Sequence, residues 1–357
     1  MEMTYSWIIY SCLIFGSGIL CDRKLESRQA VSPSFVNTKR KFNCPNGVSI
    51  EMSMVCNGVK DCSDGSDETK VLCVGKDYRT INMKTNCGKV YVDQSMILNG
   101  QRASVGTAPW NAGIYRLSES DSKYEMICGG SIISSNLVIS AARCFWESKK
   151  SSKRIIKDDG KYKIAVGKYD RNITILDNIY TQIMTVDSIY LKETFYGVSG
   201  FYAEDVAIVV IKNRISFNYY VLPICIDWNE KYNQVNGDRG KVVGWGCPNT
   251  GSISPVLLEL SLPYIDYHTC RKMYTNGFEA YMTSDKFCAG SALGPGRGVE
   301  VGYAGAGLGF LHDNAYYLTG ITNVKDTESN NSIGLFTRVN YHVQWIRELY
   351  DKHNSLN

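Results

Sequence analysis

The apolar residues of this chain are spaced mainly for strands. From residue 97 onward, short apolar runs are separated by glycine and asparagine, a pattern that is typical of all-β sandwiches and barrel pairs. The clearest runs cover 163–167, 206–211, 241–246 and 316–324. The end of the chain differs, because Val343, Ile346 and Leu349 recur at helical spacing. This spacing predicts a closing helix over 341–352.

The first residues have the pattern of an export signal. An apolar stretch from Trp7 to Leu20 is followed by a charged segment that begins at Asp22. The stretch is shorter than a membrane-spanning helix needs, so we expect a cleaved signal peptide at 1–21. The alternative is a retained N-terminal anchor, and the lack of lysine or arginine before Trp7 weakens the signal pattern. Residues 22–41 are polar and without periodicity, which predicts a disordered leader.

Composition narrows the class of protein. The 357 residues are 44% hydrophobic and 21% charged, as in a globular protein with one large domain and a small one. A net charge of +4 without a long basic block gives no reason to expect nucleic acid as a partner. Thirteen cysteines indicate disulfides formed in an oxidising compartment, so we expect a secreted, extracellular protein. The glycosylation tripeptides that begin at Asn172 and Asn330 agree with export.

The segment 42–74 is a small, cysteine-rich unit with an acidic end. It is too short to bury a real core, so disulfides or a metal must hold it together. Its start at Phe42-Asn43-Cys44, its run from Cys56 to Glu68 and its final Cys73 resemble an LDL-receptor class A repeat. The resemblance implies one calcium ion, which takes six or more oxygen ligands. The implied ligands are the side chains of Asn57, Asp61, Asp67 and Glu68 and the carbonyls of Met54 and Val59.

The class A resemblance has two departures from the family. Asn57 stands where the family usually has aspartate, so we expect weakened calcium affinity. Ser49 takes the place of the third cysteine, and its family partner is missing too, so one whole disulfide is lost. The alternative is an acidic segment that holds no metal. A connector follows at 75–96. The resemblance leaves the pairs Cys44–Cys62 and Cys56–Cys73.

Six motifs follow one another in the rest of the chain. They are Ile97-Leu98-Asn99-Gly100, Cys128-Gly129-Gly130 leading to Ala141-Ala142-Arg143-Cys144, Asp205-Val206-Ala207-Ile208, Gly244-Trp245-Gly246, the run from Gly302 to Leu308, and Phe336-Thr337-Arg338-Val339. Together they resemble trypsin-like serine proteases over 97–357, which implies an all-β double barrel with a C-terminal helix. With the class A unit in front, the chain is similar to insect modular serine proteases, which initiate immune cascades. The resemblance implies the disulfides Cys87–Cys225, Cys128–Cys144 and Cys270–Cys288, and it leaves Cys247 without a partner.

The chemistry of that family depends on three side chains. A serine protease needs a hydroxyl nucleophile, an imidazole that takes its proton and a buried carboxylate that orients the imidazole. By resemblance these positions are Ala304, Arg143 and Asp205, so only the carboxylate is kept. A methyl group attacks nothing, and a guanidinium with a pKa above about 12 accepts no proton. We therefore expect no enzymatic activity, and we expect Arg143 and Asp205 to form a structural ion pair.

Positions around the triad have changed as well. The family has an aspartate before its serine, which pairs with the freed N-terminal amine and orders the oxyanion hole; here that position is Tyr303. The bond before Ile97 follows Met96, which is not a basic residue. Gly298 stands where trypsin has the aspartate of its specificity pocket. The resemblance therefore implies that the activation and specificity machinery is altered together with the triad.

These observations predict a catalytically inactive serine protease homologue. We expect it to act as a binding partner or regulator in an extracellular proteolytic cascade, of the kind that serves insect innate immunity and melanisation. The expected partners are cascade proteases or recognition proteins. One alternative is a secreted ligand, such as a venom or salivary component. An active serine endopeptidase is the least favoured, because no base accompanies Tyr303, Ser131 or Ser140, the hydroxyls near the motifs.

Overall fold

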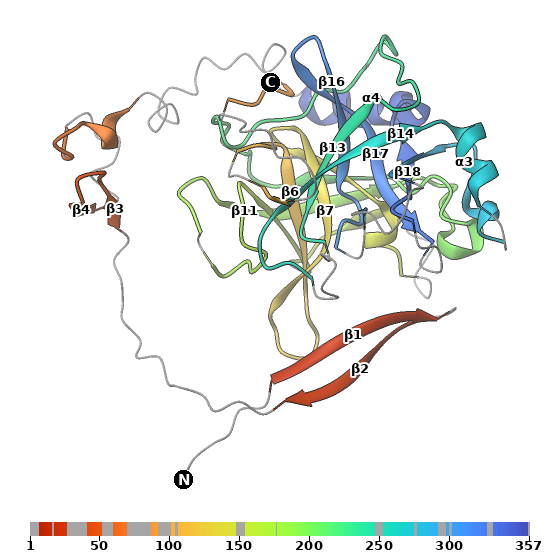
Figure 1. Cartoon of the computed structure of the whole chain (residues 1–357), viewed down its shortest axis with the longest axis horizontal. Coiled ribbons are helices and arrows are strands. Elements are labelled where there is room, and N and C mark those ends of the chain that lie inside the picture. The colour runs from red at the N-terminus through yellow and green to blue at the C-terminus, as the bar shows by residue number, and fades with distance from the viewer. Residues whose placement is uncertain are drawn as a thin grey trace. The chain divides into compact units, whose positions relative to one another are not determined.

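The computed structural model divides the chain into two compact units, Met1–Asp77 and Tyr78–Asn357 (Figure 1). Each unit is described by itself. The structure describes residues 7–15, 18–26, 41–51, 60–69, 87–91, 101–103, 106–147, 154–175, 177–246, 253–274, 277–291, 298–299, 302–326 and 331–355.

The first unit contains two short antiparallel pairs. Strands β1 (Trp7–Phe15) and β2 (Gly18–Glu26) form a hairpin. Strand β2 covers 22–26, so the irregular leader predicted for 22–41 is wrong for these residues; the signal peptide stays a prediction. Strands β3 (Lys41–Asn43) and β4 (Ser49–Glu51) pair in the class A segment, which also contains the 3₁₀ turn η2 (Ser66–Glu68).

The first barrel lies in the N-terminal half of the second unit. Its six strands are all antiparallel, and the pairing of β10 with β11 closes the ring. A short strand, β9 (Ile155–Lys157), adds to the outside edge of β11. The ring consists of β6 (Asn111–Leu117), β7 (Tyr124–Ser134), β8 (Leu137–Ser140), β12 (Ala207–Ile211), β11 (Gln182–Leu191) and β10 (Tyr162–Val166).

The second barrel is built in the same way. Its six strands are antiparallel, and the pairing of β13 with β14 closes the ring. The short strand β5 (Gln101–Arg102) extends the edge of β14. The ring consists of β13 (Arg239–Gly244), β16 (Gly307–His312), β17 (Ala315–Lys325), β18 (Gly334–Arg338), β15 (Lys286–Ala289) and β14 (Leu258–Ile265). The predicted all-β double barrel is confirmed.

Short helices connect the strands and close the chain. The turns η5 (Ala142–Cys144), η7 (Gly197–Gly200) and η8 (Phe278–Tyr281) and the helix α3 (Tyr267–Met273) lie in loops. The turn η9 (Asn340–His342) leads into α4 (Val343–Asn354). Val343, Ile346 and Leu349 of α4 are buried, which confirms the predicted closing helix. The helix begins two residues later than predicted, because residues 341 and 342 belong to η9.

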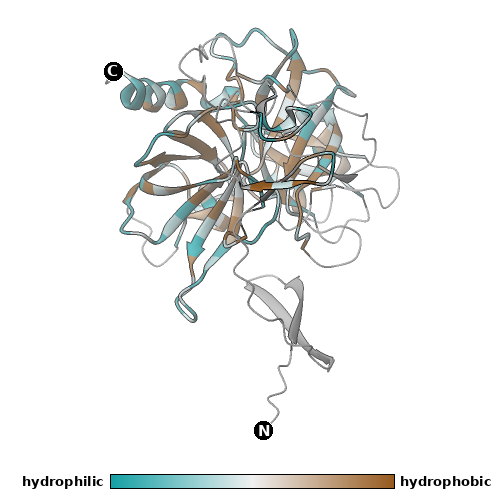
Figure 2. Cartoon of the chain, turned by 90° about the vertical axis from the view of Figure 1, so that its left-hand side faces the viewer, coloured by the Kyte–Doolittle hydropathy of each residue, from teal (hydrophilic) through white to brown (hydrophobic). Residues whose placement is uncertain are grey.

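The cores fill the barrels. In the first barrel, buried aliphatic residues of β8 and β12 pack around Trp110 and Ile114. In the second, Phe287, Leu308 and Phe336 form the centre of a separate cluster. Hydrophobic residues gather on the barrel strands and polar ones on the loops (Figure 2). The four predicted strand runs correspond to β10, β12, β13 and β17, so the short apolar runs identified them correctly.

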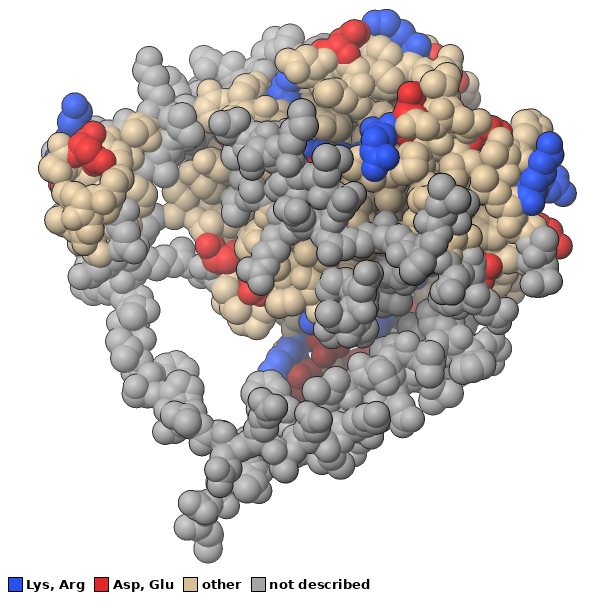
Figure 3. All heavy atoms as spheres, viewed as in Figure 1, with Lys and Arg blue, Asp and Glu red and all other residues tan. Residues whose placement is uncertain are grey.

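Disulfides tie loops to this framework. The structure forms Cys44–Cys62 in the first unit and Cys87–Cys225, Cys128–Cys144 and Cys270–Cys288 in the second, which are four of the five pairs that the resemblance implies. The fifth, Cys56–Cys73, and the unpaired Cys247 lie outside the described residues. Within the described part of the chain, no helix has the length and apolarity to span a membrane. On the face shown in Figure 3, basic and acidic side chains of the described residues are interspersed.

Candidate functional site

The carboxylate of Asp205 is completely buried where the chain enters β12. The pairing of β12 with β8 places it beside η5, which carries Arg143. The backbone N–H of Arg143 donates to Oδ1 of Asp205 over 2.8 Å, and the guanidinium Nη1 donates to Oδ2 over 2.7 Å. The structure therefore contains the ion pair that the sequence predicts.

The other end of the guanidinium reaches the second barrel. Nη2 of Arg143 donates to the carbonyl of Thr322 over 3.2 Å and also to the carbonyl of Asn323. Both carbonyls belong to β17, whereas Asp205 belongs to the first barrel. The guanidinium also lies 5.8 Å from the ring centre of Tyr202. Because its side chain is only 17% exposed, Arg143 acts as a buried cross-link between the barrels.

Electrostatics decide what this pair can do. Burial raises the pKa of Asp205, and the charge and backbone N–H of Arg143 oppose that rise. A guanidinium carries five N–H donors and no acceptor. The arrangement thus holds a fixed cation against a carboxylate and offers no group that takes a proton from a nucleophile.

Ala304 and Tyr303 lie in the turn before β16. The carbonyl of Ala304 accepts a hydrogen bond of 2.8 Å from the amide of Gly129. Tyr303 is 1% exposed and belongs to the core of the second barrel. Its ring lies so close to Gly246 that a Cβ there would approach ring carbon Cε2 to 1.8 Å. Tyr303 is therefore a packed core residue, where the family places a carboxylate.

Gly298 lies against the backbone of Ser332. A Cβ at this position would come within 2.3 Å of the carbonyl oxygen of Ser332. A larger residue, charged or not, would have to displace the backbone of Ser332. Met96 and Ile97, at the bond that the family cleaves, lie outside the described residues.

A second group of buried charges holds the loop before Asp205. Lys286, which is fully buried, donates from Nζ to the carbonyls of Phe201 and Tyr281, each over 2.7 Å. Oδ2 of Asp285 accepts from the amide of Glu204 over 2.7 Å. These contacts again join the two barrels. No role was predicted for Asp285 and Lys286 from the sequence, in which their signal is two adjacent charged residues at the start of the otherwise apolar strand β15.

The pKa values of this group follow from burial and its partners. Burial lowers the pKa of Lys286 to about 8, against the opposing charges of Asp285 and Asp205. Burial acts to raise the pKa of Asp285, but the neighbouring side chains of His342 and Thr283 bring it below its ordinary value. Nε2 of His342 lies 3.5 Å from Oδ2 of Asp285.

The class A segment shows part of its predicted metal site. Asp67 is completely buried, and its two carboxylate oxygens accept from the amides of Asp61 and Cys62 over 2.7 Å and 3.0 Å. Within the described ranges, no three acidic, histidine or cysteine side chains gather at one point. The remaining predicted ligands, Met54, Asn57, Val59 and the side chain of Glu68, lie outside the described part.

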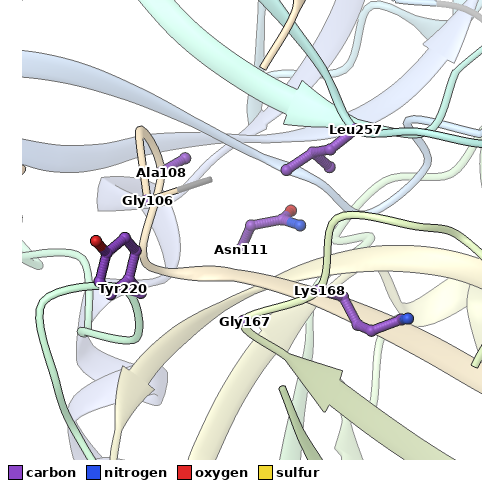
Figure 4. Close-up of a pocket in the computed structure, with 7 residues that line it drawn as sticks. All are labelled: Gly106, Ala108, Asn111, Gly167, Lys168, Tyr220 and Leu257. Atoms are coloured by element: carbon purple, nitrogen blue, oxygen red, sulfur yellow. The ribbon is translucent and has the colours of Figure 1, made fainter. Parts of the chain in front are cut away.

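A small cavity in the first barrel is a different kind of feature. Its volume is about 10 Å³, which is room for one water molecule. The amide of Asn111 points into it, whereas the ammonium of Lys168 points away (Figure 4). Asn111 is 5% exposed, and its Nδ2 has no hydrogen-bond partner among the described residues. A buried water is the ligand that this space fits.

The family model for trypsin matches residues 97–346. The chain belongs to the trypsin family. A second family model, low-density lipoprotein receptor domain class A, matches residues 38–73. The trypsin match covers all twelve strands of the two rings, and the class A match covers the Cys44–Cys62 disulfide.

This trypsin-family chain is similar to proteins whose names describe clotting factors and a serine protease. It is 28% identical to clotting factor C of Tachypleus tridentatus over 274 residues, which is 73% of this chain and 26% of that protein. It is 30% identical to coagulation factor IX of Oryctolagus cuniculus over 257 residues, or 71% of this chain and 84% of that protein. With mannan-binding lectin serine protease 1 of Rattus norvegicus, the identity is 26% over 263 residues, or 71% of this chain and 35% of that protein. The chain thus spans about a quarter of clotting factor C.

Proposed function

We propose that this trypsin-family protein is secreted and non-catalytic, and that it binds proteins of an extracellular proteolytic cascade. The observation that carries the proposal is the contact between Arg143 and Asp205. The position that needs a proton acceptor holds a guanidinium, which is fixed by the carboxylate and by two carbonyls of β17. Loss of the base or the nucleophile alone lowers the rate of such a triad by about a million-fold.

Other hydroxyl groups are poorly placed to replace the nucleophile. Ser131 is 1% exposed and Ser140 is fully buried. Oγ of Ser140 donates to the carbonyl of Gly129 over 2.7 Å. Tyr303 is buried in the core of the second barrel. A substrate reaches none of these three side chains without local unfolding, which argues against an active protease that uses other residues.

The loop before Asp205 supports a role in binding. Phe201, Tyr202 and Glu204 have positive φ angles of 53°, 51° and 58°, which non-glycine residues rarely adopt. The second barrel holds their backbone through Lys286, Asp285 and the side-chain amide of Asn323, which donates to the carbonyl of Tyr202 over 3.2 Å. A rigid loop loses little entropy when a partner binds.

The same loop presents apolar side chains to solvent. Tyr196 is 58% exposed, Val198 59% and Phe201 45%. Tyrosine is one of the residues enriched among those that contribute most to the binding energy of protein–protein interfaces. We propose this loop, 196–204, as part of the surface that contacts the partner protein.

The names of these relatives indicate what kind of protein the partner is. Their names describe clotting, coagulation and a lectin-associated serine protease. By this kinship, we infer that the partners are proteases or recognition proteins of a similar cascade. The resemblance of the chain to insect modular proteases favours a cascade of innate immunity or melanisation.

We also propose that the class A module binds one calcium ion. Asp67 and Asp61 would supply carboxylate oxygens, together with Glu68, Asn57 and the two predicted carbonyls. The buried carboxylate of Asp67, which is held in place by two amides, favours this assignment. When bound, calcium would supply positive charge that offsets repulsion among the acidic side chains.

A binding assay tests the function. The purified full-length protein is immobilised and exposed to a panel of active and zymogen cascade proteases. We expect saturable binding to at least one of them, and a loss of affinity of ten-fold or more for Val198→Asp. The matched control is Ile183→Asp, which should leave binding unchanged. Ile183 is an aliphatic residue on β11 that is also exposed, at 42%. Absence of binding across the panel would contradict the proposal.

A further inference from the structure

The loop 170–175 of the first barrel contains one of the two glycosylation tripeptides, Asn172-Ile173-Thr174. The middle residue, Ile173, is buried, whereas Asn172 and Thr174 are exposed. The folded barrel therefore anchors the tripeptide by its central side chain and turns both functional side chains to solvent.

The two exposed side chains contact each other. Oδ1 of Asn172 accepts a hydrogen bond of 2.9 Å from the hydroxyl of Thr174 and another of 3.0 Å from its backbone amide. The Asn172 amide nitrogen, Nδ2, donates to no group in the described part of the chain. Hydrogen bonds to an amide oxygen stabilise negative charge on that oxygen, so they favour loss of a proton from the nitrogen.

We infer that Asn172 carries an N-linked oligosaccharide. In this modification, Nδ2 forms a bond to the anomeric carbon of a lipid-linked oligosaccharide diphosphate. The bond between that carbon and the diphosphate oxygen breaks, the lipid diphosphate leaves, and one Nδ2 proton passes to a base of the transferring enzyme. The inference rests on the export that the proposed function includes.

The second tripeptide, Asn330-Asn331-Ser332, has the opposite geometry at its hydroxyl. Ser332 is 1% exposed. Its Oγ accepts from the amide of Ser291 over 2.9 Å and donates to the carbonyl of Ser291 over 3.2 Å. Folding therefore hides the hydroxyl that the modification needs. We expect Asn172 to be modified and Asn330 to remain unmodified.

A glycan on Asn172 would cover an apolar neighbour. The amide of Ile175 donates to the carbonyl of Asn172 over 3.2 Å, so the two residues share one turn. Ile175 is 44% exposed. An oligosaccharide here would shield this isoleucine and keep the loop from acting as a protein contact.

The test uses the full chain secreted from a eukaryotic host, once with its own N-terminus and once with a host signal in place of 1–21. The secreted protein is deglycosylated enzymatically in ¹⁸O-labelled water, and each asparagine is examined by mass spectrometry. We expect ¹⁸O-labelled aspartate at position 172 only. Asn172→Gln and Thr174→Ala should each remove the whole glycan shift, and Thr174→Ser should retain it.

Asn330→Gln is the matched control and should leave the mass of the attached glycan unchanged. Unmodified Asn172 in the secreted protein, or a glycan on Asn330, would overturn the inference. If only the version with the host signal is secreted, and it is modified at Asn172, the export part of the proposed function fails and the assignment of Asn172 stands.

Discussion

The cross-link through Arg143 makes a quantitative prediction about stability. In Arg143→Met, Asp205 stays completely buried and keeps only the backbone N–H as a partner, while the carbonyl of Asn323 loses its donor. Breaking a buried ion pair by removing one partner costs about 3–5 kcal/mol. We expect about 3 kcal/mol, the lower end, because the Arg143 side chain is 17% exposed. For a unit of this size, that corresponds to a fall of roughly 6–12 °C in Tm.

The measurement is chemical and thermal unfolding of Arg143→Met beside two controls. Lys157→Met breaks an exposed pair with Asp187, where the side chains are 72% and 38% exposed, and should lower stability far less than Arg143→Met does. Arg143→Met combined with Asp205→Leu removes both charges and should recover part of the loss. A change below about 1 kcal/mol for Arg143→Met, similar to the exposed pair, would refute the view of Arg143 as a buried cross-link.

Three further predictions follow from the site. Arg143→His with Ala304→Ser should show no turnover above background, because Tyr303 still occupies the position of the ordering carboxylate; measurable hydrolysis of a fluorogenic peptide would contradict this. Lys286 has a folded-state pKa below its unfolded one, so the unfolded chain binds more protons between about pH 8 and 10.5. The free energy of unfolding should therefore rise with pH across that window, relative to Lys286→Met, when unfolding is measured as a function of pH. The isolated class A module should be largely unfolded without calcium, and Asn57→Asp should tighten calcium binding, as judged by calorimetry and amide spectra; dispersed spectra in chelator would argue against it.

Much of the fold could be predicted from the chain because its signals are local. Short apolar runs identified β10, β12, β13 and β17, and helical spacing identified α4. The start of α4 was placed too early, since apolar spacing does not distinguish the 3₁₀ turn η9 from the first turn of the helix. The strand at 22–26 was missed, because its charged residues lack an alternating pattern.

The site was predictable where one residue replaces another in a motif. The pairing of Arg143 with Asp205 followed from their positions in two motifs. The hydrogen bonds from Arg143 to the carbonyls of Thr322 and Asn323 could not be predicted. These carbonyls come from a strand about 180 residues further on, and every residue has a backbone carbonyl whatever its side chain. The role of Lys286 was hidden for the same reason, because its partners are the carbonyls of two loops.

The central claim is that this trypsin-family protein does not cleave peptides. The most direct measurement is the rate at which the purified full-length protein hydrolyses a mixed pool of fluorogenic peptide amides, before and after engineered cleavage of the Met96–Ile97 bond. The account predicts a rate equal to the spontaneous rate in both forms. Hydrolysis above that rate, abolished by Asp205→Asn in protein that remains folded, would contradict it.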